Sequence, residues 1–362
     1  MASLSQLGNS LYRGDVSYNI VGRRKAWYLI SAILIILSIA TLGVRGLNLG
    51  IEFKGGAEFS VPLEVANDES VSQARETVLA AGETPSTVTI IGGDTIRIQT
   101  PALSTEASNA LSAALAESFA VEEANIKVQL VGPSWGEEVT RNAIQALIVF
   151  LVLVAIFLSI YFEWQMAVAA LIALAHDVLI TVGIYALSGF EVTPASVIGF
   201  LTILGYSLYD TVVVFDKVKE NTKGIHGGSR TTYSEAANLA LNQTLVRSIN
   251  TSVVALLPVL SILIVGVTLL GVGTLNDLAL ALFVGMLVGT FSSIFIATPY
   301  LCQMKERAPE NIALANRVKA RRKSGDAGND IKLEVSVGAP IVSSAGPRQQ
   351  RVKKTRSGRS GK

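Results

Sequence analysis

Long apolar runs separated by polar segments dominate the pattern of this chain. Six runs are about 20 residues long, the length that a helix needs to cross a hydrocarbon core of roughly 30 Å. They predict membrane-spanning helices at 26–44, 143–162, 166–187, 195–215, 245–270 and 278–301. The expected fold is a multispan α-helical membrane protein, with one span before residue 45 and a five-helix region at 141–301.

The first run also has features of a signal peptide, because Arg23, Arg24 and Lys25 precede it. Its apolar part is longer than the roughly 7 to 15 residues of a signal peptide, and no small-x-small cleavage pattern ends it. We interpret it as a retained span.

Basic residues flank the spans on one side. They precede the first span in the segment 1–25, they lie in the loop 216–244, and they continue in the tail 302–362. This bias marks the cytoplasmic side, and six spans return both termini to it. The tail has 15 basic and 5 acidic residues from 303 onward. We expect it to be disordered and held near anionic lipid or ribosomal RNA by charge.

The segment 45–140 lies between the first two spans and is expected to be extracytoplasmic. It holds 5 basic and 14 acidic residues. Its pattern predicts strands around 58–64, 87–91, 95–99 and 126–131, and helices around 70–81 and 105–119. This strand and helix order is that of a ferredoxin-like, split βαβ α+β domain.

Composition narrows the chemistry. Hydrophobic residues make up 50% of the chain and charged residues only 16%, against roughly 25% charged in soluble domains. Cys302 is the one cysteine, which excludes an intrachain disulfide and a cysteine zinc cluster, and His176 and His226 are the only histidines. We expect no metal and no cofactor.

Four ionisable side chains fall inside predicted spans, where an ionised group is costly and marks a functional position: His176, Asp177, Asp210 and Arg247. Adjacent helical residues point about 100° apart, so His176 and Asp177 do not face one partner, and we favour Asp177 pointing inward. Structural roles compete with this interpretation. The alternatives are that Arg247 snorkels to the lipid surface, that Asp210 acts as a plain hydrogen-bond acceptor, and that His176 and Asp177 are polar residues buried by packing alone.

Asp210 and Arg247 both lie near the cytoplasmic ends of their helices, which permits an ion pair between them. Residues three and four positions away share a helix face, which places polar neighbours beside each charge: Tyr206 and Ser207 beside Asp210, Asn250 and Thr251 beside Arg247. Such stripes are expected to face the bundle interior, because hydrocarbon satisfies no hydrogen bond. Small residues at 285, 289 and 293 predict close helix packing.

Five motifs give the chain a resemblance to a known family. They are LGIEFKGG at 49–56, VGPS at 131–134, AHDV at 175–178, GYSLYDTVVVFD at 205–216 and NQTL at 242–245, the last followed by Arg247. In order and spacing they resemble the SecD/SecF family of protein-export membrane proteins, within the resistance-nodulation-division superfamily. The first two motifs supply the residues expected at the domain junction: Gly50, Glu52, Phe53, Gly55, Gly56, Gly132, Pro133 and Ser134.

The resemblance implies a multi-pass protein of the bacterial cytoplasmic membrane that uses the proton gradient to assist Sec-dependent export. It implies a SecD partner, the SecYEG channel with SecA, and a translocating unfolded polypeptide. Asp210, Arg247 and Asp177 would form the proton relay, supported by His176, Tyr206, Ser207, Thr211, Asn250 and Thr251. The chain departs from the family pattern at Glu52, where Asp is usual, and at Tyr209, where Asn is usual.

Other functions remain open. One is a subunit of a small-molecule or lipid exporter of the same superfamily. Another is an intramembrane aspartyl protease with Asp177 as the second carboxylate, although the chain lacks a Gly-x-Gly-Asp segment. A scaffold that carries no protons is a third. We expect a proton-coupled export subunit and not an enzyme.

Overall fold

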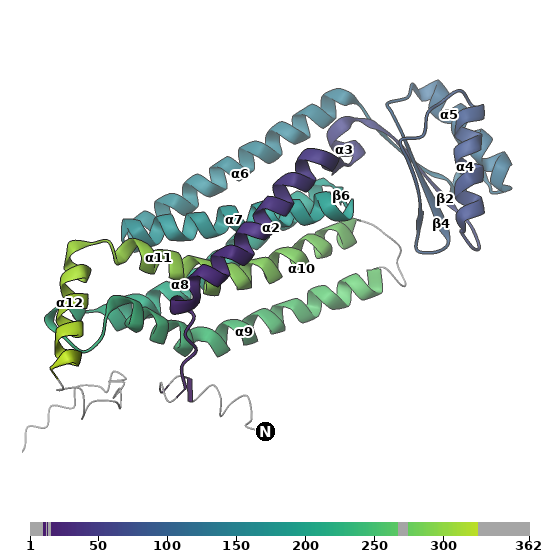
Figure 1. Cartoon of the computed structure of the whole chain (residues 1–362). Helices are drawn as coiled ribbons and strands as arrows, with labels where there is room; N and C mark the ends of the chain where they lie inside the picture. The colour runs from purple at the N-terminus through teal and green to yellow at the C-terminus, as the bar shows by residue number, and fades with distance from the viewer. Residues whose placement is uncertain (1–9, 12, 14–15, 267–273, 325–362) are drawn as a thin grey trace, which may run out of the picture.

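A computed structural model describes residues 10–11, 13, 16–266 and 274–324. It places long helices side by side, with an α/β domain at one end and a short helix, α12 (Pro309–Lys323), at the other (Figure 1). Six helical segments are long and apolar enough to cross a membrane, which confirms the predicted multispan fold: Val21–Arg45, Pro133–Tyr161, Trp164–Ser188, Pro194–Gly227, Tyr233–Val265 and Asp277–Lys305. The predicted positions 267–270 lie outside the described residues.

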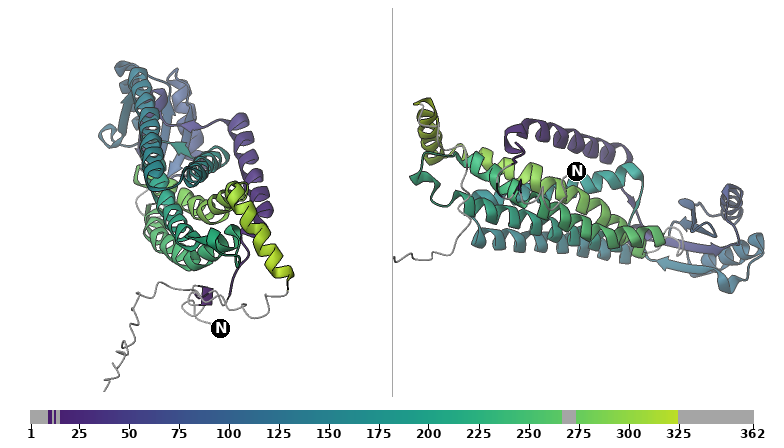
Figure 2. Two further views of the ribbon diagram at one scale, coloured as in Figure 1. Left: turned by 90° about the vertical axis from the view of Figure 1, so that its left-hand side faces the viewer. Right: turned by 90° about the horizontal axis from the view of Figure 1, so that it is seen from below.

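The spanning helices follow one another along the chain. A 3₁₀ turn, η1 (Val21–Arg23), leads into α2, and the helices are α2 (Arg24–Arg45), α6 (Pro133–Tyr161), α7 (Trp164–Ser188), α8 (Pro194–Thr222), α9 (Tyr233–Val265) and α10 (Thr274–Ser292). A π-helical turn, η5 (Ser293–Ala297), continues α10 into α11 (Thr298–Lys305). The second view in Figure 2 shows α2 lying along one side of the other helices.

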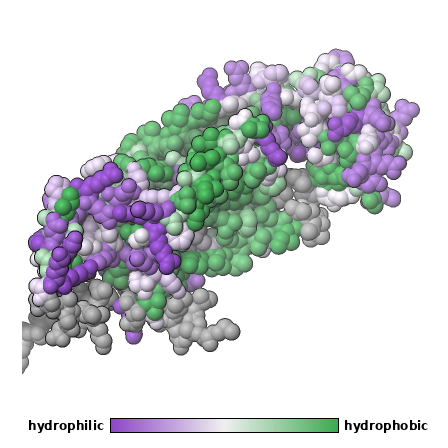
Figure 3. Space-filling model, viewed as in Figure 1, coloured by the Kyte–Doolittle hydropathy of each residue, from purple (hydrophilic) through white to green (hydrophobic). Residues whose placement is uncertain are grey.

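Three helices keep broad apolar faces toward the surroundings. In the apolar stretches that make these helices candidate spans, 11% of the residues are buried in α2, 11% in α6 and 17% in α9. The corresponding shares are 56% in α7 and 50% in the last span. Figure 3 shows the resulting apolar surface over the bundle, between a polar domain at one end and a polar group of helices at the other. Such a band fits contact with lipid or with a membrane partner.

Small residues let α10 approach α8 closely. A Cβ at Gly289 would lie 2.9 Å from the Cβ of Ser207, and a Cβ at Gly285 would overlap the side chain of Ile203. Ser293 donates a hydrogen bond to the Ser207 carbonyl at 3.3 Å. The predicted row of small residues at 285, 289 and 293 therefore does face another helix.

The α/β domain (56–131) consists of β2 (Gly56–Pro62), α4 (Asp68–Ala80), β3 (Thr87–Ile91), β4 (Thr95–Thr100), α5 (Thr105–Phe119), η2 (Glu123–Asn125) and β5 (Lys127–Val131). All neighbouring strands are antiparallel, in the order β3-β4-β2-β5. Phe59, Ile96 and Ile98 of the sheet pack with Val78 of α4 and Leu111 of α5, all fully buried. The strand and helix order follows the sequence pattern, with the first strand starting two residues earlier.

Short elements at the junction escaped the sequence pattern. β1 (Asn48–Leu49) pairs in parallel with β6 (Glu191–Val192), which lies in the loop between α7 and α8. The helix α3 (Ile51–Lys54) follows β1 and packs on α6. Two to four residues are too few to establish a period of hydrophobic positions.

The predicted loop 216–244 is mostly helical. α8 continues to Thr222, and α9 starts at Tyr233, so only a short connection containing η3 (Ile225–Gly227) remains. The Lys217–Glu220 ion pair at i,i+3 supports the end of α8, and a capping box of Thr232 and Glu235 starts α9. The charged helix ends that extend beyond the apolar spans have the same polar composition as a loop. The composition therefore predicted a loop where the helices continue.

The prediction of a disordered tail at 302–362 is wrong for its first part. α11 extends to Lys305, and α12 spans Pro309–Lys323. Leu314 and Val318, one helical turn apart, are 0% and 1% exposed, and Arg322 forms a bidentate ion pair with Glu235 at 2.9 Å. Charged residues outnumber these two buried apolar residues in α12, so the composition of the segment predicted disorder and not a packed helix. Residues 325–362 lie outside the described part of the chain.

Candidate functional site

Asp210 lies in the buried face of α8, away from the domain. Asp210 is 6% exposed, and its Oδ1 accepts a hydrogen bond of 2.6 Å from the Ser248 hydroxyl on α9. Its Oδ2 is inaccessible to solvent and has no hydrogen-bond partner in the part of the chain that the structure describes. One carboxylate oxygen is therefore held by α9, and the other is open to a new partner.

Arg247 does not form the expected ion pair with Asp210. Its guanidinium is exposed, and its Nη2 donates to the Tyr209 hydroxyl at 3.4 Å. Ser248, one position further along α9, faces Asp210 instead, since adjacent helical residues point about 100° apart. The two charges are thus on neighbouring helices but on different faces.

The polar stripe predicted with Arg247 is also displaced. Asn250 is exposed and Thr251 is half-buried, whereas the buried serine and threonine positions of α9 are Thr244, Ser248 and Ser252. Ser252 shares a hydrogen bond of 2.7 Å with Thr290 on α10. Hydroxyl residues repeated every fourth position are the sequence pattern that indicates this buried face. The charge of Arg247 instead favoured the neighbouring face of α9 in the sequence-based prediction.

His176 and Asp177 form one buried unit with α8. The His176 Nδ1 and the Asp177 Oδ1 are 3.1 Å apart, and the Asp177 Oδ2 accepts a 2.5 Å hydrogen bond from Ser207. Asp177 is 1% exposed and points inward, as the sequence argument favoured, while the His176 Nε2 is buried without a partner among the described residues. The two neighbours contact each other, and Asp177 joins them to α8.

The order of these contacts does not favour nucleophilic or aspartyl-protease chemistry. A serine nucleophile needs the histidine as its base, but Ser207 bonds to the carboxylate. An aspartyl protease needs two carboxylates that share a proton, but Asp177 bonds to Ser207 and His176, and Asp210 bonds to Ser248. In the described residues no group of three or more His, Cys, Asp or Glu side chains is placed to hold a metal ion.

Further buried hydroxyl groups lie between α8 and the last span. Thr211 and Ser293 share a hydrogen bond of 3.0 Å, and both residues are at most 2% exposed. Tyr206 packs in the apolar cluster with Val259 and Met286, with its hydroxyl buried. Ser293, Ser252 and Thr290 were not singled out as site residues, because isolated hydroxyl residues are common in spanning helices.

The junction motifs occupy one place between the domain and the bundle. A Cβ at Gly55, where φ is +76°, would lie 2.9 Å from the Cα of Pro133, and a Cβ at Gly136 would lie 2.6 Å from the Phe53 carbonyl oxygen. The backbone of α3 thus lies directly against the start of α6, whose N-cap is Gly132, followed by Pro133 and Ser134. Side chains at these glycines would separate the two segments.

Two family models match this chain. The model for the protein export membrane protein SecD/SecF, C-terminal, matches residues 111–307, and the model for the SecD/SecF GG motif matches residues 40–66. The second range contains Gly55 and Gly56, and the first contains the membrane residues described above.

Curated relatives and solved structures agree. The protein translocase subunit SecF of Streptomyces coelicolor is 50% identical over 327 residues, 90% of this chain and 87% of the relative. That of Mycobacterium tuberculosis is 44% identical over 87% of this chain and 73% of the relative.

The crystal structure of SecDF, a translocon-associated membrane protein from Thermus thermophilus, is 32% identical with a TM-score of 0.72. The match covers 81% of this chain and 39% of that one, so the chain spans about two fifths of the solved protein. By motifs, family models and relatives together, the chain belongs to the SecD/SecF family of protein-export membrane proteins.

Proposed function

We propose that this Sec translocase subunit couples the proton-motive force to protein export, with Asp210 as the proton-carrying group. The observation that carries the proposal is the Asp210 carboxylate of α8, which is buried, with one oxygen held by Ser248 of α9 and the other without a partner among the described residues. A proton can bind the Oδ2 atom without displacing any hydrogen bond. Ionisable groups at membrane depth are rare outside such roles.

The gain and loss of that proton would favour two arrangements of the helices. One elementary charge that moves through 100 mV releases roughly 2.3 kcal/mol, and a full two-state switch from 1:99 to 99:1 needs about 5.5 kcal/mol. Several protons for each stroke of the domain are therefore expected. Asp177, with His176 and Ser207, would belong to the same relay, joined to α8 through the Ser207 hydrogen bond.

A second subunit completes this site in the proposal. Tyr209, Arg247 and Asn250 lie exposed on α8 and α9, where exposed apolar side chains such as Ile249 and Val253 also lie. Hydrocarbon would leave an arginine there unsatisfied, so a membrane partner with an acidic residue fits this face. A SecD-type subunit is that partner, and the pair would act with the SecYEG channel and SecA on an unfolded polypeptide.

The orientation proposed places both termini in the cytoplasm of a bacterium and the ferredoxin-like domain outside its inner membrane. Arg24 at the start of α2 pairs with Glu306 after α11 at 2.7 Å, so the basic flanks of the first and last spans share one end. Basic flanks favour the cytoplasmic side. Exposed Lys319 and Lys323 of α12 lie at this end and suit contact with anionic lipid or ribosomal RNA.

The test is Asp210→Asn in vesicles that contain the full chain, its partner subunit and the channel. Export in the presence of a proton gradient is expected to fall to the level seen without the gradient. Asp216→Asn is the matched control, because Asp216 is an exposed acid on the same helix. If gradient-driven export survives Asp210→Asn unchanged, Asp210 is not the carrier and the proposal fails.

A further inference from the structure

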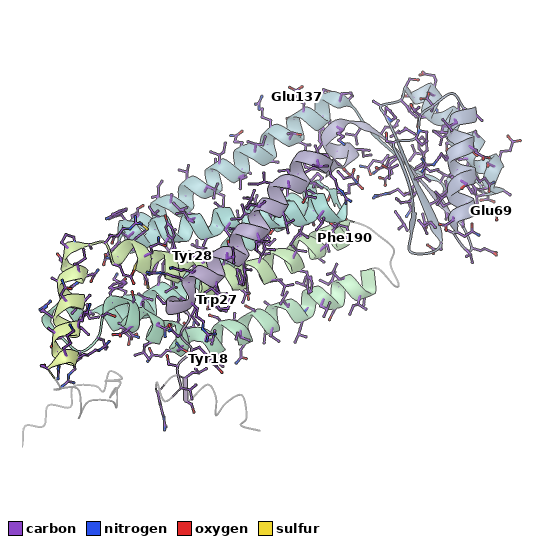
Figure 4. The ribbon with its side chains drawn as sticks, in the orientation of Figure 1. Tyr18, Trp27, Tyr28, Glu69, Glu137 and Phe190 are labelled. Atoms are coloured by element: carbon purple, nitrogen blue, oxygen red, sulfur yellow. The ribbon has the colours of Figure 1, made fainter. Side chains whose placement is uncertain are left out.

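A group of charged and polar side chains joins the α/β domain to the loop between α7 and α8. Arg97 on β4 forms an ion pair with Glu191 on β6, with 2.5 Å between Nη2 and Oε2. Gln99 on the same strand donates to the other Glu191 oxygen at 2.8 Å and to Glu58 of β2 at 3.0 Å. Both oxygens of one bundle carboxylate are thus held by the domain. Figure 4 shows Phe190, next to Glu191, at the domain end of the helices.

This junction has more negative than positive charge. Glu52 of α3, Glu58 and Asp277 of α10 lie around Glu191, and Thr193 donates to Asp277 at 3.2 Å. Within the described residues, Arg97 is the cation that pairs with these carboxylates, at 2.5 Å from Glu191 and 4.0 Å from Glu58. Ionised together, the four acids repel one another around a single guanidinium.

Glu52 has one carboxylate oxygen without a hydrogen bond. Among the residues that the structure describes, its Oε2 has no hydrogen-bond partner, and it is inaccessible to solvent. A Cβ at Gly50 would lie 2.5 Å from that oxygen and 3.1 Å from the Glu191 Oε1, so the two carboxylates are close neighbours across this glycine. Burial is the largest cause that raises the pKa of the Glu52 carboxyl above its usual value. A backbone hydrogen bond at Glu52 opposes this rise, and the charges of Glu191, Glu58 and Asp277 add to it.

We infer that Glu52 is a proton-binding site at the junction, and that its protonation strengthens the docking of the α/β domain on the loop that carries Glu191. Protonated Glu52 removes one negative charge and offers an O–H donor to the oxygens around it. Ionised Glu52 repels Glu191 and weakens the bond that Glu191 makes with Arg97. The inference rests on the proposed function for one point, the position of this junction on the outer, acidic side of the membrane.

The experiment measures the distance between domain and bundle as the pH changes. Spin labels replace Ser72, exposed on α4, and Leu187, 58% exposed at the end of α7, in a full chain where the buried Cys302 is alanine. The chain is reconstituted with its partner subunit in vesicles. For wild type we expect one narrow distance distribution at pH 5 and a broader, longer one at pH 8.

Glu52→Gln is expected to keep the narrow distribution at both pH values, and Glu52→Asp to keep the pH response. Arg97→Gln is expected to give the broad distribution at both. Glu64→Gln, an exposed acid of the same domain, is the control and should behave as wild type. A pH-independent wild-type distance, or a Glu52→Gln variant that still responds to pH, would overturn the inference. Asp210→Asn should leave the distance response intact, so failure of the relay and failure of this site are separable.

Discussion

Ser248, not Arg247, is the α9 residue that bonds to Asp210, through a hydroxyl 2.6 Å from the Oδ1 atom. Arg247 is adjacent in sequence but exposed on another face of the helix, against Tyr209. The arrangement separates two roles. The serine holds the carboxylate within the chain, and the arginine is presented to whatever covers α8 and α9.

Ser248→Ala should impair proton-driven export, although it removes only one hydroxyl group. A hydrogen bond lost from a buried charged group costs about 1–3 kcal/mol, or roughly 5- to 150-fold in an equilibrium. We expect gradient-driven export in vesicles to fall by about tenfold. Ser261→Ala is the matched control on α9, because the Ser261 residue is exposed and its hydroxyl, within the described ranges, donates to the Leu257 carbonyl of its own helix. Equal effects of the two variants would contradict the role of Ser248.

Arg247→Gln should separate stability from function. Arg247 is exposed in the isolated chain, and substitutions at such positions change the free energy of unfolding by about 0.5 kcal/mol or less. We therefore expect an unchanged melting temperature for the purified chain and a strong loss of export when the partner is present. Arg247→Lys should recover only part of the activity, because lysine keeps the charge but not the planar fork of donors. Full activity of Arg247→Gln would remove this residue from the relay.

Gly136→Ala should destabilise the junction between α3 and α6. The added Cβ would lie 2.6 Å from the Phe53 carbonyl oxygen, which is backbone and cannot rotate away. Overpacking of this kind costs about 1–3 kcal/mol. Gly43→Ala is the control: Gly43 lies within α2 with nothing within 4 Å of its Cβ position, so alanine should stabilise it by up to about 1 kcal/mol. Thermal unfolding in detergent compares the two, and a shift of the same sign in both would refute the packing argument.

Leu314→Ala tests whether α12 is part of the fold. Leu314 is fully buried, and the loss of a buried leucine side chain typically costs about 2–5 kcal/mol. We expect a lower melting temperature, or selective proteolysis after residue 305 if α12 detaches alone. Ile312→Ala, at a position 48% exposed on the same helix, should change neither. Resistance of both variants to heat and protease would show that α12 is not anchored by Leu314.

Sequence reasoning succeeded where long patterns determine structure. The apolar runs located six helices, and alternation with turn residues located the strands and helices of the α/β domain. It failed where one helix face decides the outcome. Ser248, one residue after Arg247, is the buried polar residue, because adjacent residues point to different faces of the helix. The strands β1 and β6 pair across about 140 residues of sequence, which no local pattern predicts. The same limit applies to Glu52, whose charged neighbours Glu191, Glu58 and Asp277 come from three other elements.

Glu52→Gln should also make stability depend less on pH. Because the pKa of Glu52 in the folded chain lies above its usual value of 4.5, the folded state holds this proton to higher pH than the unfolded state does. Below about pH 4.5 both states are protonated and the carboxyl contributes no penalty. As the pH rises through the pKa of Glu52 in the folded chain, the ionised carboxylate destabilises the junction.

Glutamine cannot ionise. The melting temperature of the Glu52→Gln variant should therefore exceed that of wild type at pH 8, and the difference should vanish toward pH 4.5. Glu64→Gln should follow the wild-type curve throughout, since Glu64 is exposed. A difference that stays constant from pH 4.5 to 8 would mean that Glu52 acts through packing and not through its charge.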